Sequence, residues 1–101
     1  MASRSQLQSI LETTLGSGNV YFQPPESFKM NYPCIVYHRN DGLTDFANDV
    51  PYNHTIRYTV VVIDKNPDSI IPNKVAMLSR CTFDRHFVKD NLNHDIYQIY
   101  F

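Results

Sequence analysis

The stretch His54-Thr-Ile-Arg-Tyr-Thr-Val-Val-Val-Ile-Asp64 decides the fold of this chain. It is rich in β-branched and aromatic residues and contains neither Gly nor Pro, a composition that favours strands. It is the strongest strand signal in the sequence. We therefore expect a long strand here that anchors a sheet.

Weaker strand signals lie on both sides of this stretch. Val20-Tyr-Phe22 predicts a short strand that ends near Pro24-Pro25, and Pro33 opens Cys34–His38, whose lack of polar alternation suggests a central strand covered on both faces. Residues 81–88 and 96–101 alternate in polarity, and a loose loop over residues 89–93 joins them in an expected antiparallel hairpin. The last strand should be an edge strand that reaches the C-terminus.

Two helices are expected. Leu7, Ile10, Leu11 and Leu15 recur at helical spacing, which predicts an amphipathic helix from Ser3 to about Leu15 that ends at Gly16-Ser-Gly18. Ile71, Val75 and Leu78 predict a short second helix, with Pro72 tolerated only in its first turn.

These elements predict an α+β fold: a mainly antiparallel sheet of about four to five strands, with two helices packed on one face. The 101 residues suffice for one core, so residues 1–101 should form a single domain. A net charge of −1 lacks the broad positive field that non-specific nucleic-acid or anionic-membrane binding needs. The absence of a long apolar run or a signal-like N-terminus predicts a protein of the cytosol, without membrane contact.

Residues 39–52 are predicted to form a long polar loop. They contain three carboxylates, Asp41, Asp45 and Asp49, and few apolar anchors. Their spacing does not match a calcium loop, and acid–base catalysis needs partly buried groups. Long loops in compact domains are usually functional or mobile, so we expect this one to make contacts with other molecules.

Few residue patterns suggest chemistry. His38, His54, His86 and His94 form neither a helical pair nor an HxH pair, and Cys34 and Cys81 lie in apolar segments that suggest buried thiols, although a disulfide stays open. Asp84-Arg85-His86 is the most catalytic-looking cluster, with Asp84 and His86 expected on one face of a strand and a cross-strand partner such as Asp95 or His94 as the plainer alternative. The aromatic residues of the strands could stack on single-stranded nucleic acid, but core filling explains most of them. No cofactor, metal or catalytic residue is therefore predicted.

The order of these segments carries a resemblance. A helix ending at Gly, Val20-Tyr-Phe-Gln-Pro-Pro25, Tyr32-Pro-Cys-Ile-Val-Tyr37 and the strand Arg57–Asp64 together resemble the tail-terminator or tail-completion proteins of tailed bacteriophages. Cys81–Phe87 and Asn91–Asp95 resemble stretches of phage neck proteins. The resemblance spans nearly the whole chain and rests on pattern and short strings, without a catalytic signature.

The resemblance implies a structural virion protein in the neck of a tailed phage, assembled in the host cytoplasm. It would form a ring, typically a hexamer, that terminates the tail tube and joins it to the head connector or stopper. DNA would pass through this ring without specific contacts. The expected assembly interface comprises Arg39, Asp41, Asp45, Phe46, Asp49, Arg57 and Arg85. The alternatives are another head–tail connector (a stopper or adaptor), a small monomeric binding module, or an enzyme that uses Asp84 and His86.

Overall fold

The computed structural model describes residues 4–25, 29–47 and 50–101, with only the backbone described over 41–47 and 50–55. Within these residues the chain forms two helices and five strands: α1 (Arg4–Leu15), β1 (Val20–Phe22), β2 (Cys34–Ala47), β3 (Val50–Asp64), α2 (Ile71–Ala76), β4 (Cys81–Lys89) and β5 (Leu92–Tyr100). The element order is the predicted one.

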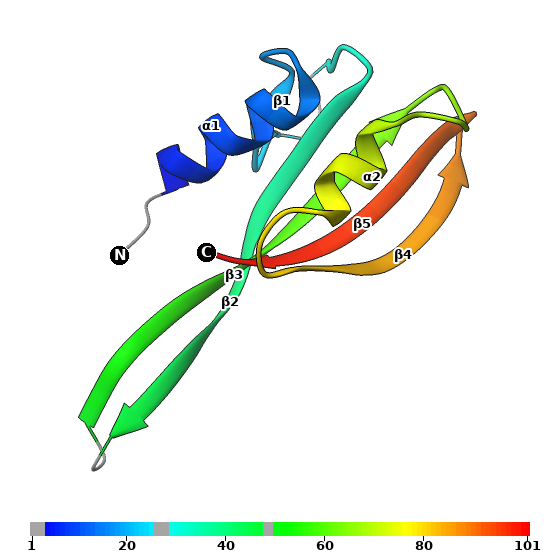
Figure 1. Ribbon diagram of the computed structural model, residues 1–101. Helices are drawn as coiled ribbons and strands as arrows, with labels where there is room; N and C mark the ends of the chain where they lie inside the picture. The colour runs from blue at the N-terminus through cyan, green and yellow to red at the C-terminus, as the bar shows by residue number, and fades with distance from the viewer. Residues whose placement is uncertain (1–3, 26–28, 48–49) are drawn as a thin grey trace.

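The five strands form one sheet in the order β1-β2-β3-β5-β4 (Figure 1). Only β1 and β2 are parallel, and the other three pairs are antiparallel. The predicted α+β class, a mainly antiparallel sheet with two helices, is confirmed. One finer expectation is wrong: β5 lies inside the sheet, between β3 and β4, so the edges are β1 and β4. The strand β2, expected to be central, is an interior strand between β1 and β3.

The core lies between one face of the sheet and the two helices. Alternate residues of β3, Tyr58, Val60 and Val62, face α1 and α2, as strand geometry requires. Leu7 and Leu11 of α1 and Val75 of α2 are fully buried against them. Ile10, predicted on the same apolar face, lies at its margin and is 37% exposed. The helical periodicity therefore identified the correct face of α1 but not its width.

Hydrogen bonds around Tyr37 fix α1 on the sheet. The buried Tyr37 hydroxyl donates to the Oε1 atom of Gln8 and accepts a 3.2 Å bond from Nη1 of Arg4. Gln8 in turn donates from Nε2 to the carbonyl oxygen of Val20, at 3.0 Å. Burial raises the pKa of Tyr37, while the neighbouring Arg4 guanidinium opposes this. The three residues connect α1 to both β1 and β2.

The predicted loop over residues 39–52 is wrong. The strands β2 and β3 continue through it to Ala47 and Val50, paired in register from Cys34↔Ile63 to Ala47↔Val50. Polar residues are tolerated in this region because strand pairing satisfies the backbone whatever the side chains are. The polar composition of the segment, which suggested a loop, reflects a pair of strands outside the core.

The predicted loose loop over residues 89–93 is also wrong. The strands β4 and β5 continue to Lys89↔Leu92, which leaves a two-residue turn at Asp90-Asn91. Both turn residues have positive φ, at 54° and 62°. Asp and Asn tolerate this left-handed conformation, which tight hairpins require because it matches the strand twist.

Candidate assembly surface

The outer half of the β2–β3 hairpin projects from the body as a two-stranded ribbon (Figure 1). The strand β1 pairs with β2 only as far as Tyr37, and β5 pairs with β3 only from Arg57 to Asp64. From Arg57 to Val50 the ribbon extends about 23 Å. It makes the molecule elongated, at 51 × 24 × 23 Å, and gives a radius of gyration of 14.6 Å, against about 13 Å for a compact chain of this length.

A chain of hydrogen bonds marks where the body ends and the ribbon begins. On the face opposite the helices, Asn40 Nδ2 donates to Thr59 Oγ1 at 3.1 Å, and the Thr59 hydroxyl donates to Gln98 Oε1 at 3.0 Å. Gln98 Nε2 then donates to Asp84 Oδ2 at 3.0 Å. Asn40 and Asp84 both occupy register shifts, of β2 and β4 respectively. This series of hydrogen bonds thus crosses four strands and fixes the positions of two β-bulges.

The predicted interface residues fall into two groups on opposite sides of the sheet. Arg39 is exposed on β2 just before the ribbon, and Asp41 is the register partner of the half-buried Arg57. Arg85 lies across the sheet on β4, away from this group. The backbones of Asp45 and Phe46 belong to the ribbon, and Asp49 lies outside the described residues. The ribbon therefore gathers most of these residues, and Arg85 belongs to a separate surface.

That separate surface is the edge strand β4, which the sequence analysis did not single out. Past Cys81 all its residues are exposed, including Phe83 (57%), Phe87 (39%) and Val88 (60%). Phe83 makes an edge contact with Tyr97 at 5.5 Å between ring centroids, and Phe87 stacks on His94 at 4.5 Å. Apolar residues occur at both odd and even positions of this segment. Burial of one face of a strand does not explain this pattern, which is a sequence signal for the exposed apolar surface.

The Asp84–His86 pair proposed as a catalytic possibility is not formed. The bulge between Phe83 and Arg85 breaks strict alternation, so Asp84 lies beside Gln98 on the open face. His86 instead lies 2.9 Å from Asp95, joined through Nδ1 and Oδ1, and Asp95 pairs in register with the core residue Val62. Asp84 and His86 therefore point to opposite faces, and the plainer alternative of a cross-strand partner at Asp95 is confirmed.

The aromatic residues do not form one stacking platform. Tyr58 and Tyr97 are buried in the core, whereas Phe83 and Phe87 are exposed on opposite faces of the sheet. A strand of nucleic acid on one face could therefore not contact both exposed rings. Among the described residues, no group of three or more His, Cys, Asp and Glu side chains is arranged to hold a metal ion.

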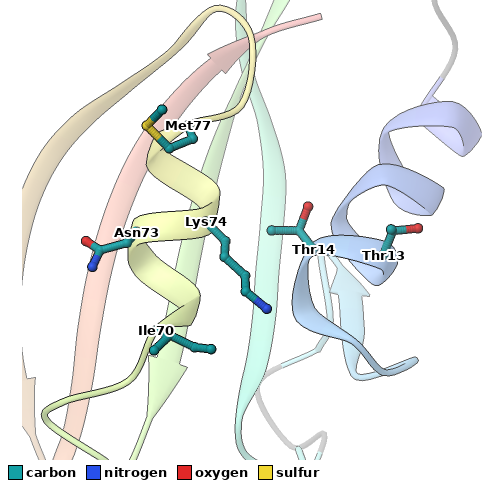
Figure 2. A pocket seen from close by; sticks show the side chains of 6 residues that line it. All are labelled: Thr13, Thr14, Ile70, Asn73, Lys74 and Met77. Atoms are coloured by element: carbon teal, nitrogen blue, oxygen red, sulfur yellow. The ribbon is translucent and has the colours of Figure 1, made fainter.

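A shallow groove separates the two helices (Figure 2). It has a volume of about 550 Å³ and is lined by Thr13, Thr14, Ile70, Asn73, Lys74 and Met77. Lys74 extends from α2 into the gap toward Thr14 (Figure 2). The lining contains two hydroxyls, one amide and the Lys74 amine, and no carboxylate or thiol.

Both cysteines are free thiols. Burial raises the pKa of Cys34 from 9.0 to about 12, with a smaller contribution from the Asp64 carboxylate, and burial raises that of Cys81 from 9.0 to about 11. Because the thiolate is the nucleophilic form, both groups are poor nucleophiles at neutral pH. Cys34 is buried as expected, whereas Cys81 is only partly buried.

We predict that iodoacetamide at pH 8 alkylates both cysteines of the native protein much more slowly than the cysteines of the urea-unfolded chain. The folded thiols hold their protons more tightly than the unfolded ones. Stability is therefore fully present below pH 9, and it falls as pH rises toward 11 and 12. Mass spectrometry of the alkylated peptides measures the first effect, and urea unfolding at pH 8 and pH 10.5 measures the second. Rapid native alkylation of Cys34 would contradict the account.

Comparisons with known proteins add no relative. No protein-family model matches the sequence, and no curated protein matches it either. Neither helix in the described part of the chain has the length and apolarity to cross a membrane.

Proposed function

We propose that this protein is a structural subunit of a tailed-phage neck, which assembles into a ring, typically a hexamer, that terminates the tail tube and joins it to the head connector. The observation that most supports this proposal is the projecting ribbon. An isolated two-stranded hairpin is marginally stable in water, and nothing in the described chain covers its outer half. A ribbon of this length is therefore suited to contact a neighbouring molecule.

The rest of the molecule supports the proposal. The core is complete beneath the two helices, so the ribbon is not needed to bury it. The two candidate surfaces, the ribbon and the β4 edge, lie on opposite sides of the sheet. Different surfaces that meet head to tail produce a ring when the rotation between copies closes. A stopper or adaptor ring of the same neck would use the same geometry.

The test is the solution mass of the purified protein, alone and with purified tail tubes. The proposal predicts a ring, either free in solution or formed at one end of the tube. A second candidate, the monomeric binding module, predicts one subunit in both cases.

A further inference from the structure

The sheet has two free edges of different kinds. The whole of β4 pairs with β5 alone, and the outer half of β2 pairs with β3 alone. Gln23 accepts the Arg39 N–H through Oε1 at 3.3 Å, so the second free edge begins at Asn40. At β1, the Val20 carbonyl oxygen already accepts a hydrogen bond from the Gln8 side chain. Within the described chain, the two long unpaired edges are therefore β4 and the segment from Asn40 to Ala47.

We propose that these two edges pair with each other between copies: β4 of one subunit joins the outer β2 edge of the next. The inference rests on the proposed ring, for which it names the contact. The edges match in length, with nine residues in β4 and an eight-residue segment of β2. Free strand edges readily accept another strand, because their backbone donors and acceptors are otherwise left to water.

The strand directions favour this pairing. The strand β3 runs opposite to β2, β5 opposite to β3, and β4 opposite to β5, so β4 runs opposite to β2. A second copy placed edge to edge in the same orientation therefore presents its β4 antiparallel to the outer β2 edge. Antiparallel pairing is the commoner arrangement and the slightly more stable one per residue.

Charge and apolar surface also fit. The strand β4 carries Arg85 and Lys89 against Asp84, whereas Asn40–Ala47 contains Asp41 and Asp45 and no basic residue. An added strand would cover exposed apolar side chains on both faces of β4, Phe83 and Val88 on the helix side and Phe87 on the other. The contact would thus join a positive, apolar edge to a negative one.

The short strand β1 gives the contact its offset. It occupies β2 at Ile35–Tyr37, so an incoming β4 can pair only farther out along the ribbon. Each subunit is therefore shifted along the strand direction relative to the previous one. A sheet that closes on itself requires such a stagger and a tilt of its strands.

The first experiment compares Val88→Glu with Met77→Glu. Both residues are exposed, at 60% and 86%, but Met77 caps the C-terminal end of α2 in the helix layer and belongs to neither strand edge. A glutamate on the edge should raise the protein concentration needed for assembly by about tenfold or more, because it replaces a covered apolar side chain with a negative charge that faces the acidic segment Asn40–Ala47. Met77→Glu should assemble as the parent does. Equal assembly of both variants would overturn the inference.

The second experiment identifies the partners by crosslinking. In a Cys81→Ser background, Val88→Cys subunits are mixed with affinity-tagged Thr44→Cys subunits and treated with a short thiol crosslinker. Crosslinks should join the two kinds of subunit. Crosslinks between Val88→Cys subunits only, or none within a ring of correct mass, would overturn the edge contact while the ring proposal stands. A protein that stays monomeric at every concentration and on tubes would instead overturn the ring proposal itself.

Discussion

Replacing residues 43–55 with Asn-Gly should leave a folded protein that no longer assembles. The cut follows the register pair Gly42↔Ile56, and Asn-Gly suits the two-residue turn that would close the shortened hairpin. The core cluster lies outside the deleted segment, and Ile56, which packs against that core, is retained. We expect the free energy of unfolding to change by about 1 kcal/mol or less, because shortening a connection affects loop entropy only weakly.

Circular dichroism and light scattering measure the two consequences of this truncation. The spectrum and the unfolding midpoint report the body, and the mass reports assembly with and without tail tubes. A truncated protein that still forms rings would show that the ribbon is dispensable. One that fails to fold would show that the ribbon belongs to the folding unit.

Leu11→Ala should give a large loss of stability, as should Leu7→Ala in the same helix. The Leu11 side chain is fully buried between α1 and the sheet, so its removal leaves a cavity that the surrounding strands cannot fill. We expect a loss of about 2–5 kcal/mol, a large part of the total for a domain of this size. Urea unfolding in the truncated background separates folding from assembly.

Ile10→Ala is the matched control for this substitution. Ile10 immediately precedes Leu11 in the same helix and is 37% exposed, so its truncation removes apolar contact without opening an enclosed cavity. We expect its effect to be about 1 kcal/mol or less. Similar losses at Leu11 and Ile10 would contradict the placement of α1 on the sheet.

The sequence predicted the elements whose signals are local. Leu7 and Leu11 at helical spacing identified the buried face of α1, and the run from Tyr58 to Ile63 identified the central part of β3. Gly16 ends α1 where expected, with a positive φ of 83°. In each case neighbouring residues carry the preference, so no knowledge of distant contacts is required.

The parts that the sequence did not predict depend on pairing between distant segments. The ribbon is defined by backbone pairing between residues that are distant in the sequence, whereas its polar composition resembles that of a loop. The bulge at Asp84 changes which face His86 occupies, and alternation alone cannot locate a bulge. The strand order makes β4 an edge, and the apolar residues at both odd and even positions of β4 are its local trace in the sequence. At Asp90-Asn91 a signal was present, because both residues favour the turn that closes a tight hairpin.

The most direct test of the ring is the solution mass by multi-angle light scattering, at two protein concentrations and with added tail tubes. The account predicts a mass several times the 11.8 kDa of one chain, a hexamer being six subunits, in free solution or bound to the tube. A mass of 11.8 kDa at both concentrations, with no binding to tubes, would contradict it and favour a monomeric binding module.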